Sequence, residues 1–362
     1  MISSGVSHSN FMGRAIRVAL VALAVSLSAA PYVSAQQELT FSLFERYLES
    51  LRVGANIPGM SAAIVQNQRV VWDSGFGFSD VEHAIRARAD TPYHVAGLTE
   101  ALSSAILLEQ CVETGHAGLD ERIQQRVSSY GDSSATMRDL LSHRSPNGGF
   151  KYDPGRYASL TPLAEACVGK GTPFRQAIWE KVLYRLNMFD SVPAENVGDE
   201  SADDRVQFSA GDLERFSSVL KRLALPYRVN GSSVAVNASV AKGVDAATGA
   251  ISTVRDLAKF DNALDAAGAL LNRDTLNAMW SNQPGTPTGL GWFVQNYNGQ
   301  TLYWQFGNIP GAYSSLMLKV PSRRLTLILL ANSDGLSAPF PLQDGDVNAS
   351  LFARTFLRLF VG

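Results

Sequence analysis

TPYHVAGLTEALSSAILLEQCVETG, residues Thr91–Gly115, carries the strongest structural signal in the chain. It begins as an extended piece that contains proline and continues as a long apolar helix pattern, which its last glycine stops. At the junction, Ala96–Glu100, a loop enters the N-terminus of a buried helix. Free N–H groups and a positive partial charge make such a position suitable for a nucleophile. This junction offers Gly97 and Glu100, and neither is a good nucleophile.

The composition is that of a globular protein with a sizeable core, since 46% of the 362 residues are hydrophobic and 18% are charged. This length fits one large domain or two small ones. The net charge is -2 and no long basic run appears. We therefore expect no nucleic-acid partner and no basic surface patch for binding to a membrane. The His residues are scattered without metal-ligand spacing, so no metal or other cofactor is expected.

The first 35 residues predict an export signal. Arg14 and Arg17 form a basic region, Val18 to Ala30 is apolar, and Val33-Ser34-Ala35 is a small-x-small cleavage site. The alternative is an uncleaved membrane anchor, for which the apolar run is short. We therefore expect a periplasmic or secreted protein that has no stable membrane span once residues 1–35 are removed.

Two cysteines, Cys111 and Cys167, leave two alternatives open. In an exported protein they can form a disulfide. Cys111 lies within the apolar helix pattern, however, so a buried free thiol is equally compatible with the sequence.

Strand patterns occur near both ends of the mature chain. Met60–Val65 and Arg69–Gly75 read as a hairpin around a short polar turn. After residue 289 the pattern returns to strands, at Leu290–Tyr297, Thr301–Gln305, Ser314–Lys319 and Leu325–Ala331. Leu39–Val53 and Asn348–Phe360 read as amphipathic helices that flank these strands.

The region between the strands is mostly helical. Helix patterns cover Tyr157–Val168, Phe174–Leu186 and Val254–Ala267, whereas Met188–Asn230 is polar and predicts loops and short helices. The simplest architecture that fits these patterns is an α/β (α+β) fold, in which one antiparallel sheet is built from both ends of the chain.

In this architecture residues 36–362 form a single domain after the signal peptide, 1–35. The sheet part covers about 36–92 and 286–362, and a large helical insertion covers about 93–285. A cleft is expected where the insertion meets the sheet.

A series of motifs follows the same order along the chain: IPGMSAAIV, GFGFSD, TPYHVAG, MRDLLSHRS, FKYDPGRY, GAISTVRDLAKF, GLGWFV and FGNIPGAYSSLMLKVPSRRLTLILLANSDG. Together they resemble the serine β-lactamase and penicillin-binding protein superfamily, in the branch of class C β-lactamases, D-alanyl-D-alanine peptidases and related esterases. The resemblance covers nearly the whole mature chain. It implies the same β-lactamase/transpeptidase-like architecture as the strand and helix patterns.

The resemblance also implies acyl-transfer chemistry. In that superfamily the serine of a Ser-x-x-Lys motif, at the start of the buried helix, attacks a carbonyl carbon. Aligned by the flanking sequence, the serine position in this chain is Gly97 and the lysine position is Glu100. Glycine has no side chain, so covalent acylation at this position is impossible.

Two further motifs of the superfamily map onto this chain with changes. The Tyr-x-Asn motif retains Tyr152, but its asparagine position is Pro154. Gln305 begins the strand motif in place of lysine or histidine, and Gly307 retains its glycine. None of the three catalytic motifs of the superfamily is therefore intact. The candidate ligand-binding residues that remain are Tyr152, Gln305 and Gly307.

Glu100 reverses the charge of the missing lysine. A carboxylate near Tyr152 raises the pKa of the phenol and hinders the tyrosine as a base. Two other roles for Glu100 stay open. It can interact with the helix dipole as a first-turn carboxylate, or it can activate a water molecule in the space left by Gly97.

The sequence thus predicts an exported pseudoenzyme that binds a ligand or partner in or near the old cleft. The resemblance suggests a peptidoglycan-type peptide as one ligand class, with another small molecule or a protein partner as further options. The alternative is an active hydrolase of the same superfamily with a non-standard mechanism.

Overall fold

The structure is a computed structural model that describes residues 1–2, 35–169, 171–198 and 201–362. The predicted signal peptide lies almost entirely outside these residues. The chain divides into two compact units, Met1–Leu43 and Phe44–Gly362. Helix α2 (Ala35–Gly54) begins in the first unit and ends in the second, which confirms the predicted helix at Leu39–Val53. The single-domain organisation of residues 36–362 stays a prediction.

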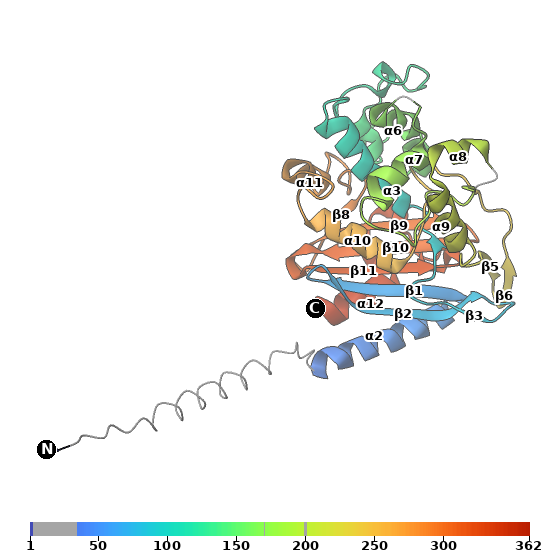
Figure 1. Ribbon diagram of the computed structural model, residues 1–362, viewed down its shortest axis with the longest axis vertical. Coiled ribbons are helices and arrows are strands. Elements are labelled where there is room, and N and C mark those ends of the chain that lie inside the picture. Colours follow the sequence, from blue (N-terminus) through green and yellow to red (C-terminus); the bar gives the residue numbers. More distant parts are fainter. Residues whose placement is uncertain (3–34, 170, 199–200) are drawn as a thin grey trace. The chain divides into compact units, whose positions relative to one another are not determined.

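A seven-stranded antiparallel sheet lies at the centre of the second unit (Figure 1). Its spatial order is β3-β2-β1-β11-β10-β9-β8. The middle of the sheet joins the two ends of the chain, because β1 pairs with β11 and Met60 lies opposite Ala331. This confirms the predicted sheet. The strands are β1 (Gly59–Gln66), β2 (Arg69–Asp80), β3 (Ile85–Arg86), β8 (Phe293–Tyr297), β9 (Gln300–Ile309), β10 (Tyr313–Val320) and β11 (Leu325–Ala331).

Both faces of the sheet are covered, which explains the continuous apolar run of β11. Ile328 belongs to the core that α3 shares, while the alternate residue Leu327 is buried on the opposite face. On that opposite face Ile64 of β1 lies between its two register partners, Leu327 of β11 and Trp72 of β2. The ring of Phe44 packs there against Trp72 and against α12 (Leu351–Phe360).

The region between the two groups of strands contains most of the helices. Helix α3 (Leu98–Leu107) is buried along its whole length and contacts β9 and β10 on one side and α6 and α7 on the other (Figure 1). It continues as a π-helical turn, Leu108–Glu113, and the chain leaves at Gly115 with a φ of 73°. This confirms the helix predicted from the Thr91–Gly115 segment. None of the described helices has both the length and the apolar character needed to cross a membrane.

The other elements of this region are short. Strand β4 pairs with β7, and β5 pairs with β6. The bounds are β4 (Tyr93–His94), α4 (Met137–Leu141), α5 (Pro154–Ala158), α6 (Thr161–Val168), α7 (Phe174–Ile178), α8 (Ala202–Gln207), α9 (Ala210–Leu220), β5 (Tyr227–Asn230), β6 (Ser233–Val236), β7 (Ile251–Ser252), α10 (Val254–Asp265) and α11 (Arg273–Met279).

The segment Met188–Asn230 is more regular than its polar sequence predicts. Its longest helix, α9, has 11 residues and begins at the N-cap Ser209, whose side chain accepts the Asp212 N–H. Only Leu213, Phe216 and Val219 of this helix are buried. A stripe of three apolar side chains gives a weak periodic signal, and the capping residue therefore identifies the helix better than its hydrophobic pattern.

A disulfide joins Cys111, in the turn after α3, to Cys167 in α6, with the two Cα atoms 5.1 Å apart. This decides between the two alternatives that the sequence left open. Both cysteines are buried, so the bond ties the central helix to its neighbour inside the helical region.

Removal of this disulfide is expected to lower the melting temperature by several degrees. The bond closes a loop between residues 56 positions apart, and such a link stabilises a fold mainly by restricting the unfolded chain. Thermal unfolding of the Cys111→Ala/Cys167→Ala variant beside the parent protein measures the effect. Two reactive thiols in denatured protein that has never been reduced would contradict the assignment.

Candidate active site

The junction before α3 brings the sheet and the helix together. Ala96 takes a left-handed conformation with a φ of 49°, which turns the chain from β4 into the helix. Gly97 follows as the N-cap with a φ of −64° and a ψ of −10°, and it makes no side-chain cap. The predicted loop into a buried helix N-terminus is therefore present, with a glycine at the position that the sequence resemblance assigns to the nucleophile.

The space beside Gly97 is filled by strand β9. A Cβ atom built on Gly97 would lie 2.4 Å from the carbonyl oxygen of Phe306 and 3.1 Å from the hydroxyl of Tyr152. The approach is mutual, because a Cβ atom on Gly307 would lie 2.6 Å from the Gly97 nitrogen. The two glycines let the backbones meet directly. This position thus lacks a nucleophile and also lacks the room for one.

Glu100 is the centre of a buried polar cluster. Its side chain has an exposed fraction of 0%. Its carboxylate accepts hydrogen bonds from Gln305 Nε2 at 2.9 Å, from His143 Nε2 at 3.1 Å and from the Tyr152 hydroxyl at 3.4 Å. Burial raises the pKa of Glu100, against the opposing effect of His143 and the other two donors. The position that the sequence resemblance assigns to a lysine therefore holds an enclosed carboxyl group.

His143 is the site residue that the sequence did not reveal. Its backbone is left-handed, with a φ of 50°. Its Nδ1 accepts the Asp153 N–H at 3.2 Å, which leaves Nε2 as the nitrogen that carries a proton toward Glu100. The ring also packs against Tyr152, with 4.5 Å between ring centroids. The available signal was its position inside the motif MRDLLSHRS, at the start of the loop that leads to Tyr152.

Tyr152, the expected tyrosine of the site, is poorly suited to act as a base. Burial and the charge of Glu100 hold the pKa of Tyr152 well above its usual range. The direction agrees with the prediction from charge reversal, and burial contributes more than the carboxylate does. The ring is partly exposed and packs against Phe306, with 5.0 Å between centroids.

Pro154 has a backbone role rather than a contact in the cluster. It is exposed and occupies the first turn of α5, where a proline costs no hydrogen bond. Asp153 is the N-cap, and its carboxylate accepts the Arg156 N–H at 3.0 Å. Helix α5 therefore begins three residues before the predicted start at Tyr157. The predicted Tyr157–Val168 helix is thus divided in two, because α5 ends at Ala158 and a separate helix, α6, covers Thr161–Val168.

Gln305 has its whole amide engaged within the protein. Its Nε2 donates to Glu100 and to the Gly291 carbonyl at 3.2 Å, and its Oε1 accepts the Phe306 N–H at 2.9 Å. The side chain is 1% exposed, and Gly307 is also buried. These contacts make Gln305 a structural link between β9 and α3.

This arrangement contains no free catalytic base. Glu100 is enclosed by three donors, and the second ring nitrogen of His143 is engaged by a backbone N–H group. A water molecule activated by Glu100 would need space that the Phe306 carbonyl takes at Gly97. Within the described residues, no group of three His, Cys, Asp or Glu side chains is arranged to hold a metal ion.

A cavity of about 300 Å³ adjoins the cluster, and His143 is one of the residues that line it. Its charged side chains are Lys151, Asp153 and Arg156, so both signs of charge are present. The complete lining is Leu140, His143, Ser145, Pro146, Asn147, Lys151, Asp153 and Arg156.

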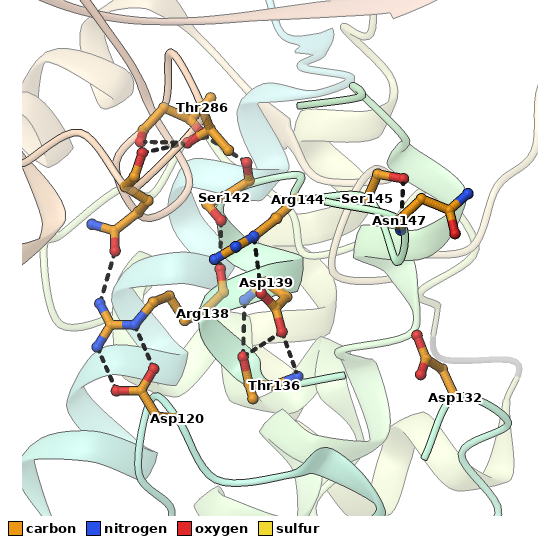
Figure 2. A network of polar contacts seen from close by, with 12 residues as sticks. Asp120, Asp132, Thr136, Arg138, Asp139, Ser142, Arg144, Ser145, Asn147 and Thr286 are labelled. Carbon is orange, nitrogen blue, oxygen red and sulfur yellow. Dashed lines mark hydrogen bonds and ion pairs between the residues drawn. The ribbon is translucent and has the colours of Figure 1, made fainter. Parts of the chain in front are cut away.

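The polar network in Figure 2 holds the loop that borders this cavity. Arg144, at the start of the loop, lies 4.0 Å from the carboxylate of Asp139. Asp139 and Thr136 form a capping box at the start of α4. Arg138 of the same helix pairs with Asp120 at 2.6 Å. The cavity therefore has a wall that is anchored to a helix and not a free loop.

Comparison with curated proteins finds partial relatives. Protein flp of Staphylococcus aureus is 28% identical over 96 residues, which cover 25% of this chain and 19% of that protein. The serine beta-lactamase-like protein LACTB, mitochondrial, of Mus musculus is 27% identical over 146 residues, which cover 36% of this chain and 26% of that protein. The chain thus matches about a fifth to a quarter of the length of these relatives.

Solved structures match over most of the chain. An octameric penicillin-binding protein homologue from Pyrococcus abyssi has a TM-score of 0.70 at 18% identity, over 88% of this chain and 77% of its own. FmtA from Staphylococcus aureus has a TM-score of 0.68 at 15% identity, over 90% of both chains. D-amino acid amidase from Ochrobactrum anthropi, complexed with D-phenylalanine, has a TM-score of 0.65 at 19% identity, over 87% of this chain and 97% of its own. At these identities the similarity establishes the fold.

A sequence model of the beta-lactamase family matches residues 44–347. This range contains α3, the Glu100 cluster and all seven strands of the central sheet. The chain therefore belongs to the beta-lactamase family.

Proposed function

We propose that this protein is an exported pseudoenzyme of the beta-lactamase family, which binds a ligand or a partner and forms no acyl-enzyme. The observation that carries this proposal is the junction at Gly97, where the Phe306 carbonyl takes the space of a nucleophile's side chain. The buried carboxyl of Glu100 adds support, because it replaces the cation that would assist proton transfer.

The ligand-binding role rests on Tyr152 and the adjoining cavity. Gln305 and Gly307 are buried, so a ligand would reach them only if β9 moved away from the helix. Lys151 and Asp153 line the same cavity and can bind a carboxylate and an amine respectively. This pairing suits a short peptide with free termini. Peptidoglycan-type peptides are one such class, and a protein partner presenting a similar end is another.

The disulfide supports the proposed location. Such bonds persist in oxidising compartments and are rare in the reducing cytosol. Both Cys111 and Cys167 are used in this bond, and the described residues contain no other cysteine. We therefore propose that the mature protein resides in the periplasm or outside the cell.

A non-standard hydrolase is the second candidate, and the Glu100–His143 hydrogen bond is the observation that favours it. Carboxylate–histidine pairs orient the base in many hydrolases. In this pair, however, both nitrogens of His143 already have partners. The pseudoenzyme is therefore the better supported function.

Incubation with a penicillin or a fluorophosphonate is expected to leave the intact mass unchanged, and nitrocefin is expected to remain unhydrolysed. Mass spectrometry and absorbance measure these two results. The Glu100→Gln variant is the comparison for any turnover. An adduct on the parent protein, or turnover that this variant abolishes, would establish the hydrolase.

Binding is tested by calorimetric titration with a muropeptide that has free termini. We expect Lys151→Ala to weaken binding about tenfold, since it removes a charged hydrogen-bond donor. Lys221→Ala, at an exposed lysine outside this cavity, is the matched control. Equal affinity in both variants would exclude the cavity as the binding site. No binding by the parent protein would favour a protein partner.

A further inference from the structure

A lysine lies buried between two carboxylates where α10 packs on the sheet. Lys319 of β10 has a side chain that is 3% exposed. Its Nζ contacts Oδ1 of Asp261 and lies 2.9 Å from Oδ1 of Asp265. The two aspartates are four residues apart on α10, so they share one helix face. This cluster is formed by elements other than those that form the Glu100 cluster.

The environment of Lys319 differs from that of other paired lysines in the chain. Lys259 and Lys242 also contact carboxylates, but their side chains are 44% and 62% exposed. An ion pair without access to water is costly, and desolvation offsets much of its attraction. Asp261 is 1% exposed, whereas Asp265 is 34% exposed and lines a cavity that Lys319 and Arg324 also line. The buried Lys319 ammonium therefore contacts two carboxylates, only one of which is itself buried.

One carboxylate oxygen of Asp261 has no hydrogen-bond partner in the part of the chain that the structure describes. Oδ1 accepts a hydrogen bond from the Thr326 hydroxyl at 3.1 Å. Oδ2 is buried and, among the described residues, makes no hydrogen bond. Nearly all buried polar atoms in native proteins are paired, so this atom requires an explanation.

We propose that Lys319 and Asp261 form an intramolecular isopeptide bond between Nζ and Cγ. The bond would replace two buried charges by a neutral amide. It would also remove the unpartnered oxygen, while Oδ1 would remain as the amide carbonyl and keep its bond from Thr326.

The reaction is a balanced condensation. An ammonium and a carboxylate give one amide and one water, with no oxidant and no other reactant. Asp265 contacts Nζ, so its carboxylate can accept protons from the amine and pass them to the leaving oxygen of Asp261. Nζ then attacks Cγ, the C–Oδ2 bond breaks, and two of the three ammonium protons leave with Oδ2 as water.

The electrostatics of the cluster favour this role for each group. Burial, aided by Asp265, raises the pKa of Asp261 even against the attraction of Lys319, which favours the neutral carboxyl that a nucleophile attacks. For Lys319 burial lowers the pKa, but the two carboxylates outweigh burial and the net direction is upward. The amine therefore needs a base to become a nucleophile, and Asp265 is the carboxylate in position.

Mass spectrometry of the reduced, denatured full chain tests the proposal. We expect the parent protein to be lighter by one water molecule and Lys319→Arg to have its full calculated mass. Trypsin cleaves after Arg273, between the two partners, so the link would join the peptide Phe260–Arg273 to the peptide that begins at Asp274. Asp265→Asn is expected to retain the unreacted lysine, because it lacks the base.

The pair Lys259–Asp256 is the control within the same digest. Its Nζ and Oδ1 atoms lie 2.6 Å apart, but its lysine is exposed and has one carboxylate, so no link is expected there. A parent chain of full mass, cleaved by trypsin after Lys319, would overturn the proposal. A linked Asp265→Asn chain would overturn the assignment of Asp265 as the base.

Discussion

Gly97→Ser is expected to lower the free energy of unfolding by about 3 kcal/mol, because it forces a side chain into an occupied space. The obstructing atom is the carbonyl oxygen of Phe306, 2.4 Å from the position of the new Cβ. This oxygen belongs to β9, which is held between β8 and β10, so it cannot yield as a flexible side chain can. Urea unfolding of the variant and the parent protein measures the difference.

Gly131→Ser is the matched control, since a Cβ atom at Gly131 meets nothing within 4 Å. Its stability is expected to stay within about 0.5 kcal/mol of the parent value. The double variant Gly97→Ser/Glu100→Lys restores the two motif residues, but we expect no acylation by an activated ester, because Phe306 still fills the approach to the hydroxyl. A stable Gly97→Ser protein that is labelled on the new serine would show that β9 moves away readily.

Glu100→Ala is expected to destabilise the fold by about 3 kcal/mol, because it removes the common acceptor of three donors, two of them buried. Those donors are Gln305, His143 and Tyr152. In this variant Nε2 of His143 has no other acceptor among the described residues, while Gln305 keeps the Gly291 carbonyl. Glu100→Gln is the matched variant, since its amide oxygen can accept from the first two and its amino group can donate to the Tyr152 oxygen. We expect this second variant to fold, and chemical denaturation of both variants provides the comparison.

The pH dependence of the free energy of unfolding distinguishes the effect of the Glu100 charge from the effect of the shape of its side chain. The pKa of Glu100 is raised in the folded state above its ordinary value of 4.5, so the folded chain holds a proton that the unfolded chain releases. This contribution to stability is fully present below 4.5 and is lost as the pH rises through the raised pKa. The Gln variant lacks this loss. Its stability relative to the parent protein should therefore increase with pH, and parallel curves would contradict the assignment.

The strands of the sheet could be predicted because the sequence patterns that mark them involve only neighbouring residues. β11 is an uninterrupted apolar run and β1 with β2 reads as a hairpin around a short turn, so strand positions follow from neighbouring residues. The helix after Gly97 was equally clear from its apolar spacing. That strands near the two ends of the chain share one sheet follows from the need to bury one core, whereas the register of β1 on β11 was not predicted.

The closure of the site could not be predicted in this way. It depends on the approach of Phe306 to Gly97, two backbone segments that are distant in sequence and meet only in the folded chain. His143 was missed for a related reason, since its role depends on a left-handed backbone and on an N–H group of Asp153. The alignment placed a carboxylate at Glu100, but the donors that surround it come from separate elements.

The pairing of β1 with β11 also governs when the fold can be completed. Contacts between residues distant in sequence form slowly, because much of the chain must be ordered before they are made. During synthesis β1 has only its hairpin partner β2 until the residues of β11 emerge, so the centre of the sheet closes late. For a protein that we propose to be exported, this delay keeps the growing chain unfolded and fit for translocation, and it leaves the final assembly of the core to the far side of the membrane.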